Sequence, residues 1–189
     1  MDSPLSDLVC LILLIFALRA NACFAQIETA LTSSHRGRLE RLAENGEAGA
    51  AESLALLEHA DRPIAMAQAG VTCMSLFTGL GIGLFALPLF ERALTKLLPG
   101  MEVYAAALIL STFVMTTLTL LFGDFLPKQI ALQNPESVLL HKHRTIGLLT
   151  RLTALPSAAL ISMSRGILLI FGINPENRIS ATEDAVKDL

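Results

Sequence analysis

The fold class is decided by residues 8–27, which read LVCLILLIFALRANACFAQI. An apolar run of this length is what an α-helix needs to cross the roughly 30 Å hydrocarbon core of a bilayer. A secretory signal peptide is the alternative, because Ala20-Asn21-Ala22 resembles a cleavage site. Such a peptide begins with a positively charged segment, whereas residues 1–7 contain two aspartates and no Lys or Arg. We therefore expect a retained membrane helix.

Two further segments, residues 64–90 and 103–122, are apolar enough to be predicted as a second and a third span. Only 16% of the chain is charged, against about 25% in soluble domains. The net charge of −3 and the lack of a basic stretch argue against nucleic acid as a partner. We expect an all-α integral membrane protein with three transmembrane helices in contact with lipid. No nucleotide-binding glycine motif or nucleophile motif is found, so we do not expect an enzyme.

Residues 33–62 form a polar insert between the first two spans, reading SSHRGRLERLAENGEAGAAESLALLEHADR. Gly46 separates two stretches with helix-like apolar spacing, which predicts a helix-turn-helix outside the bilayer. Its acidic residues either form a solvated face or attract cations.

Residues 127–171 are interrupted by Pro135 and Pro156. The segment 146–171 is long enough to span, but it contains Arg151 and Arg165. We predict broken amphipathic juxtamembrane helices in the interface, with a fourth span as the alternative. Residues 176–189 are a polar tail.

The orientation in the membrane is predicted from the positions of Lys and Arg, because these residues are in excess in cytoplasmic loops. The segment before the first span has none and the turn at 91–102 has two. The insert and the segment after the third span carry more: Arg36, Arg38, Arg41, Arg62, Lys128, Lys142, Arg144, Arg151 and Arg165. We expect a plasma-membrane (cell inner membrane) protein with its N-terminus outside and its C-terminus in the cytoplasm.

Polar side chains recur at helical intervals within the spans, which predicts a polar cavity between the helices. The stripes comprise Asn21, Glu28 and Thr32; Gln68, Thr72, Ser75 and Gly79; and Thr112, Thr116, Thr119 and Gly123, followed by Asp124. Oxygen ligands suit Mg²⁺ or Na⁺, and intramembrane acids indicate function by default. The alternatives are that the hydroxyls only bond backbone carbonyls, and that Asp124 only caps a helix beginning at Pro127. Arg19 lies on the opposite face of the first span. We expect it either to pair with an acid at a subunit contact or to reach a water-filled cleft.

Two stretches carry a family resemblance. Residues 21–31, NACFAQIETAL, followed by SSHRGRLERLAENG, resemble the first signature of the CorC / cyclin M family of magnesium transporters. Residues 123–128, GDFLPK, and 133–136, QNPE, resemble the second signature, and residues 68–72, QAGVT, resemble the start of the family's second helix. The likeness covers residues 8 to about 175.

This resemblance implies a homodimeric three-span domain that exports Mg²⁺ in exchange for Na⁺ entry. By position it also implies that Asn21, Ser75, Gly123 and Asp124 hold the metal. Glu28, Thr72 and Gln68 are candidates for the ion pathway. The family usually has Ser at the position of Ala25 and Glu at that of Asp124, so a non-transporting regulator or scaffold subunit is the alternative. The family also usually carries paired cystathionine-β-synthase-type domains after this one, and we expect none within these 189 residues.

Overall fold

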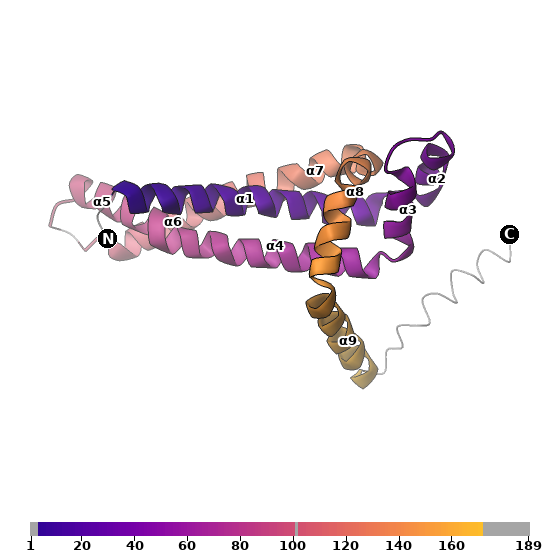
Figure 1. The fold of residues 1–189 in the computed structure, drawn as a ribbon. Helices are drawn as coiled ribbons and strands as arrows, with labels where there is room; N and C mark the ends of the chain where they lie inside the picture. Colours follow the sequence, from indigo (N-terminus) through magenta and orange to yellow (C-terminus); the bar gives the residue numbers. More distant parts are fainter. Residues whose placement is uncertain (1–3, 101, 172–189) are drawn as a thin grey trace.

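The structure, a computed structural model, describes residues 4–100 and 102–171. Within these residues, three helical stretches are long and apolar enough to cross a membrane, namely Asp7–Ser33, Asp61–Leu97 and Tyr104–Gln133. They run roughly alongside one another as an elongated bundle (Figure 1). The predicted all-α fold with three membrane helices is confirmed.

The first span, α1 (Pro4–Ser33), packs along α4 (Asp61–Gly81) of the second span. Two glycines of α4 allow this contact. A Cβ added to Gly70 would lie 2.5 Å from the ring of Phe24, and one added to Gly81 would lie 2.9 Å from Leu14. Small residues therefore bring the two helix backbones close together.

The second and third spans each contain a π-helical turn, in which the helix is locally wider than an α-helix. In the second span, η1 (Ile82–Ala86) joins α4 to α5 (Leu87–Leu97). In the third, η2 (Thr119–Phe125) joins α6 (Tyr104–Leu118) to α7 (Leu126–Gln133).

These turns correct two sequence-based boundaries. The turn predicted at 91–102 is helical as far as Leu97, and the third span does not end at Gly123-Asp124 but continues to Gln133. Pro127 does not break the third helix because it stands in the first turn of α7, directly after the π turn. A proline is tolerated at the beginning of a helical segment, where its missing N–H is not needed.

The insert folds as the predicted helix-turn-helix, with α2 (Arg36–Glu44) followed by α3 (Ala50–Glu58). Gly46 and Gly49 in its turn have φ of 76° and 82°, a backbone conformation that glycine adopts without strain. Arg36 pairs with Glu40 at 2.8 Å and with Glu58 at 3.2 Å on an exposed surface. This pairing favours the solvated-face interpretation of the insert's acids over a cation-attracting pole.

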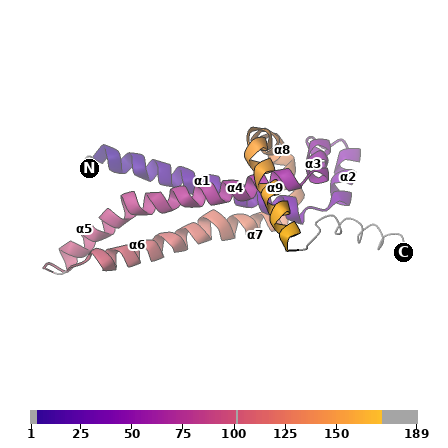
Figure 2. The same ribbon diagram turned by 90° about the horizontal axis from the view of Figure 1, so that it is seen from below.

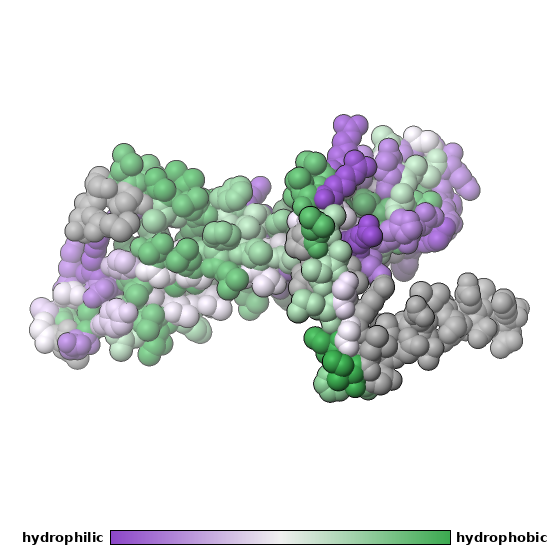
Figure 3. All heavy atoms as spheres, turned by 60° about the horizontal axis from the view of Figure 1, so that its bottom comes forward, coloured by the Kyte–Doolittle hydropathy of each residue, from purple (hydrophilic) through white to green (hydrophobic). Residues whose placement is uncertain are grey.

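The buried core lies where α1, α2, α4 and α8 (Pro135–Leu152) meet, at one end of the bundle. Its largest side chains are Ile27, Leu39, Met66, Leu139 and Ile146. Figure 3 shows the long helices as a largely hydrophobic surface, with the hydrophilic α2–α3 end beyond them. A hydrophobic flank with a polar end is the arrangement expected for a domain embedded in lipid.

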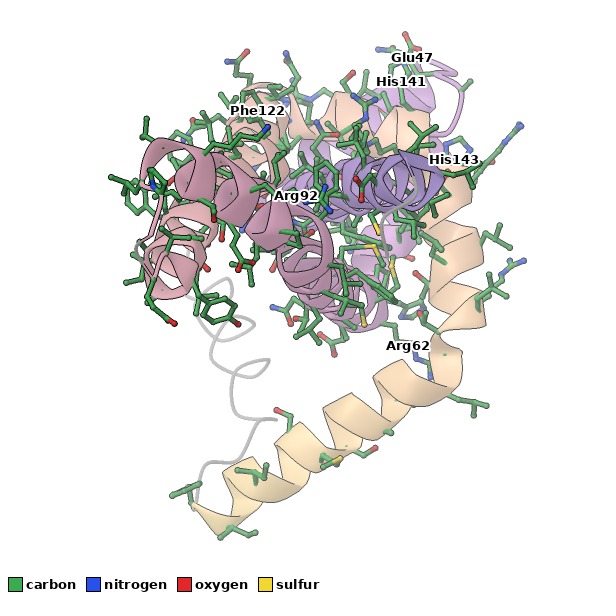
Figure 4. The ribbon with its side chains drawn as sticks, turned by 90° about the vertical axis from the view of Figure 1, so that its left-hand side faces the viewer. Glu47, Arg62, Arg92, Phe122, His141 and His143 are labelled. Carbon is green, nitrogen blue, oxygen red and sulfur yellow. The ribbon has the colours of Figure 1, made fainter. Side chains whose placement is uncertain are left out.

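Two helices follow the third span and run across the long axis of the bundle, α8 and then α9 (Ala154–Ile170) (Figures 1 and 2). The chain bends at Asn134 and Thr153, so the second bend precedes Pro156 rather than coinciding with it. Viewed along the bundle, α9 projects away from the long helices (Figure 4), and its Leu155 is 86% exposed. Among the described residues, none after Gln133 forms a span candidate, which fits interfacial helices. The predicted tail at 176–189 lies outside the described residues.

Glu136 joins the start of α8 to the start of α2. Its carboxylate is 4% exposed, accepts a hydrogen bond from the His35 backbone N–H at 3.1 Å, and accepts one from Arg38 at 3.2 Å. Burial by itself would raise the pKa of Glu136, but the backbone N–H groups of His35 and of Glu136 itself, together with Arg38, outweigh it and hold the pKa below its ordinary value. Glu136 is thus charged at neutral pH and fixes α8 against the insert.

Candidate cation site between the long helices

A cavity of about 750 Å³ opens between α1, α4 and the η2–α7 region. Its lining combines the polar stripes that the sequence placed on three separate spans. The predicted site residues that line it are Asn21, Glu28, Gln68, Thr72, Ser75 and Asp124. Gly123 lies beside the cavity, where its backbone oxygen accepts a hydrogen bond from Asn21. The structure therefore brings all seven predicted residues into one region of the domain.

Asn21 is the most deeply placed polar side chain of this cavity, with 2% of its surface exposed. Its Nδ2 donates a hydrogen bond to the backbone oxygen of Gly123 at 3.2 Å. Because that oxygen can only accept, the amide orientation is fixed and Oδ1 faces the other way. Oδ1 is buried and has no hydrogen-bond partner among the described residues. An unpaired buried acceptor costs free energy, so Oδ1 of Asn21 is a candidate ligand for a cation.

Gly123 permits this arrangement because it lacks a side chain. A Cβ at this position would lie 3.0 Å from Nδ2 of Asn21 and 3.0 Å from Cδ1 of Leu18. Both distances are tighter than ordinary van der Waals contact, so a larger residue would push the amide from its place. The glycine is thus required by the close approach of η2 to α1.

The π turn η2 decides which side chain of the third span enters the cavity. Straight α-helical spacing from Thr116 and Thr119 leads to Gly123, but the cavity is lined by Thr116, Thr119, Asp124 and Lys128. The wider turn advances the pattern by one residue, which brings the Asp124 carboxylate inward while Gly123 packs on α1. The segment before α7 makes no side-chain capping bond, so the geometry does not support the alternative that Asp124 is a helix cap.

Lys128 lies between the two acids of the cavity. Its Nζ is 2.8 Å from Oδ1 of Asp124 and 3.8 Å from Oε2 of Glu28. All three side chains are partly buried, with 37%, 33% and 21% of the Lys128, Asp124 and Glu28 side chains exposed. Two carboxylates and one ammonium give the cavity a net charge of −1. The site therefore already accommodates a cationic group, supplied by the protein itself.

The hydroxyls along α4 are bonded within their own helix, as the alternative interpretation expected. Thr72 donates to the Gln68 carbonyl at 3.0 Å and Thr78 to the Met74 carbonyl at 2.9 Å. A hydroxyl that donates still has lone pairs, so these bonds do not prevent its oxygen from accepting a cation. Ser75 and Thr72 are exposed on the cavity side of α4. Ala25, where the family usually has Ser, is fully buried and does not line the cavity.

Residues 12–189 match the family model described as the cyclin M transmembrane N-terminal domain. The chain belongs to the cyclin M family. The resemblance drawn from the signatures at 21–46 and 123–136 is thereby confirmed. In this cyclin M domain the two signatures face each other across the cavity, because Asn21 from the first bonds Gly123 from the second.

Curated relatives agree with this assignment. UPF0053 protein sll0260 of Synechocystis is 32% identical over 171 residues, covering 88% of this chain and 38% of that protein. UPF0053 protein YrkA of Bacillus subtilis is 25% identical over 175 residues, covering 89% of this chain and 39% of that protein. The polyamine export protein of Haemophilus influenzae is 32% identical over 122 residues, covering 64% of this chain and 28% of that protein. The chain spans less than half the length of these relatives, and it is a multi-pass membrane protein like the family.

The sequence did not indicate two features of this site. The first is the place of Lys128 in the cavity, because the sequence assigned this residue only to the second signature and to the positive charge that sets orientation. Its spacing of four residues from Asp124 was a signal, since residues at i and i+4 share a helix face. The second is Thr78, a buried member of the cavity wall that lies three residues beyond Ser75. Both lie on the face already marked by predicted site residues.

Proposed function

We propose that this cyclin M domain forms a membrane transport pathway for Mg²⁺, exporting it across the plasma membrane as a secondary transporter rather than acting as an enzyme. The observation that carries the proposal is the cavity within the spans that is lined by Asn21, Asp124 and Glu28. The buried Oδ1 of Asn21 has no hydrogen-bond partner among the described residues. Mg²⁺ prefers hard oxygen ligands in near-octahedral geometry and gives up its water reluctantly. Amide and hydroxyl oxygens supply ligands, and a carboxylate offsets the loss of hydration.

In this proposal Asp124 is the principal charged ligand, completed by Asn21, Ser75 and the Gly123 region. Glu28, Thr72 and Gln68 line the route to one mouth of the cavity. Lys128 bonds Oδ1 of the Asp124 carboxylate, so an arriving Mg²⁺ would compete with its ammonium for this side chain. Among the described residues no three His, Cys, Asp or Glu side chains cluster together, which leaves neutral oxygens as the remaining donors.

The decisive experiment is Mg²⁺ flux from proteoliposomes with and without an opposing Na⁺ gradient. Export that accelerates with inward Na⁺ supports the coupled mechanism, and export without Na⁺ dependence supports a Mg²⁺ pathway of another kind. If purified protein neither binds Mg²⁺ by calorimetry nor moves it, the alternative of a non-transporting regulator or scaffold subunit is favoured.

A polyamine is a second candidate cargo, because an ammonium group already lies between the two carboxylates and because one relative is named a polyamine export protein. The terminal amines of spermidine would repeat the contacts made by Lys128. The same liposomes distinguish the two cargoes: spermidine that is itself exported, and that inhibits Mg²⁺ export, favours the polyamine.

The proposed orientation places the N-terminus outside and the α2–α3 insert in the cytoplasm. Single cysteines introduced at position 47 and position 97 in a cysteine-free background test this. We expect an impermeant maleimide to label position 97 from outside intact cells and position 47 only after permeabilisation. The reverse pattern would invert the topology.

We also propose that the domain is a homodimer joined through the small-residue faces of the second and third spans. A Cβ at Gly79 or Gly83 would meet nothing within 4 Å in one protomer, but Gly79 lines the cation cavity whereas Gly83 does not. Gly83→Leu should therefore weaken dimerisation measured by light scattering in mild detergent. A wild-type protein that elutes and cross-links only as a monomer would contradict the dimer.

A further inference from the structure

A second cavity lies on the opposite side of α1 and has the opposite charge. It measures about 560 Å³ and is bounded by α1, the end of η2, α7 and α8. Two of its lining side chains are cationic, Arg19 and Lys142, and none is acidic. Arg19 and Asn21 are two positions apart on α1, which places them roughly 200° apart around the helix. The helix therefore separates an acidic cavity from a basic one.

Lys142 is brought to this cavity from a distant part of the sequence. Its Nζ donates to Oε1 of Gln26 at 2.6 Å and lies 3.4 Å from Sγ of Cys23. An ammonium group has three donors and these contacts use two, one of them weak. The side chain is half-buried, so a charged donor is directed into the cavity at the level of Gln26.

Arg19 has no carboxylate partner among the described residues, although it lies within the first span. It is seven residues before Gln26, which corresponds to roughly 10 Å along the helix axis. An unpaired arginine inside a membrane helix is costly and marks a functional position by default. Its flexible stem allows the guanidinium to extend along the wall of the cavity that it shares with Lys142.

The remaining walls are apolar and face outward. Phe122 is 50% exposed, Leu126 39% and Ile130 58%. A soluble anion gains nothing from such walls, whereas the acyl chains of a phospholipid pack against them while the headgroup phosphate meets the cations. Basic pockets between membrane helices are suited to anionic headgroups for this reason.

We propose that the cavity lined by Arg19, Gln26 and Lys142 binds the phosphate headgroup of an anionic phospholipid. Arg19 contacts the phosphate through its planar guanidinium, whose geometry matches two phosphate oxygens. Lys142, held by Gln26, contributes a second positive charge. The acyl chains lie over Phe122, Leu126 and Ile130. This site is distinct from the proposed cation pathway and does not depend on transport.

Native mass spectrometry of the full chain in mild detergent tests the proposal, with added phosphatidylglycerol or the zwitterionic phosphatidylcholine. We expect retention of phosphatidylglycerol in preference to phosphatidylcholine. Arg19→Gln and Lys142→Gln should each lower phosphatidylglycerol affinity about fivefold, since one cation near an anionic headgroup contributes ~1 kcal/mol. Lys142→Arg should retain binding.

Arg144→Gln is the matched control, because Arg144 is an exposed cation on the same helix that does not line the cavity. An equal loss in this variant would mean that lipid senses only general surface charge and would overturn the site. Unchanged binding in Lys142→Gln would overturn it too, even if Arg19→Gln fails to fold. Displacement of phosphatidylglycerol by millimolar inorganic phosphate would identify a soluble anion instead, and retention of neither lipid would point to an acidic protein partner. Both results contradict the lipid proposal.

Discussion

The two sides of α1 have opposite chemistry within one helix. On one side, Asn21 and Glu28 face a cavity with two carboxylates and one ammonium. On the other, Arg19 and Gln26 face a cavity with two cations and no acid. The acidic side is built from side chains that bond one another closely, whereas Arg19 on the basic side has no acidic partner in the described part of the chain. In our two proposals, a single apolar helix serves an ion pathway on one side and a lipid contact on the other without mixing their charges.

The largest expected effect separates the two sides most sharply. Asp124→Asn removes the carboxylate proposed to offset Mg²⁺ dehydration but keeps the shape of the side chain. We expect Mg²⁺ affinity by calorimetry to fall at least about tenfold, equivalent to ~1.4 kcal/mol, with phosphatidylglycerol binding unchanged. Glu47→Gln, an exposed acid in the insert turn, is the control. Full Mg²⁺ binding and efflux in Asp124→Asn would remove the ion role from this residue.

Gly123→Ala should also act on the acidic side. The added methyl group would lie 3.0 Å from the Asn21 amide, and overpacking of this kind costs about 1–3 kcal/mol. We expect a lower melting temperature and weaker Mg²⁺ binding, because Asn21 must move. Gly147→Ala on α8 is the matched control, since its Cβ would meet nothing within 4 Å. Equal effects in the two variants would show that the close contact between η2 and α1 is not important.

Glu136→Gln tests whether the basic side depends on α8 being fixed to the insert. It weakens the charge-assisted bond with Arg38, which contributes about 1–3 kcal/mol, and should lower thermal stability and loosen the helix that carries Lys142. The folded pKa of Glu136 is below its ordinary value, so its stabilising contribution is present above an unfolded pKa of about 4.3 and is lost as pH falls through the folded pKa. The melting-temperature difference between wild type and Glu136→Gln should therefore shrink from pH 7 toward pH 4 and below. A difference that grows on acidification would contradict this sign.

The smallest effect is expected from Ala25→Ser. The family usually has Ser here, so the substitution is predicted to tighten Mg²⁺ binding, and one added oxygen contact contributes about 1 kcal/mol. Ala25 is fully buried outside the cavity lining, so its hydroxyl must reach the site through a small rearrangement. No change in Mg²⁺ affinity would indicate that this chain has rebuilt its site without position 25.

The sequence predicted the three spans because helices in lipid must satisfy their own backbone hydrogen bonds and present apolar side chains. It predicted the residues of the acidic side because α-helical spacing placed each polar stripe on one face of its helix. It placed the end of the third span wrongly, at Gly123-Asp124, because a glycine followed by an acid resembles a helix end. The observed π turn lies against Leu18 and Asn21 at Gly123, and these residues are more than 100 positions away in the chain, so no local pattern indicates the turn.

The basic side was not predicted for a related reason. Arg19 was recognised as anomalous, but its neighbour Lys142 comes from α8, and no local pattern connects the two positions. Their proximity depends on how α8 crosses the bundle, which is set by the core around Leu139 and Ile146 and by Glu136. Pairings between distant helices of this kind are decided by packing, which one sequence does not specify.

Lys128 is attached to the helix that carries Asp124, one turn away. A tethered group competes with free ions at an effective concentration in the millimolar range or above, independently of the solution. In the proposed pathway, a cation that leaves the cavity would therefore be replaced within the molecule, without waiting for another ion to arrive. The two carboxylates would keep a positive counter-charge at every stage, and a free cation would occupy the site only where it competes successfully with the tethered ammonium of Lys128.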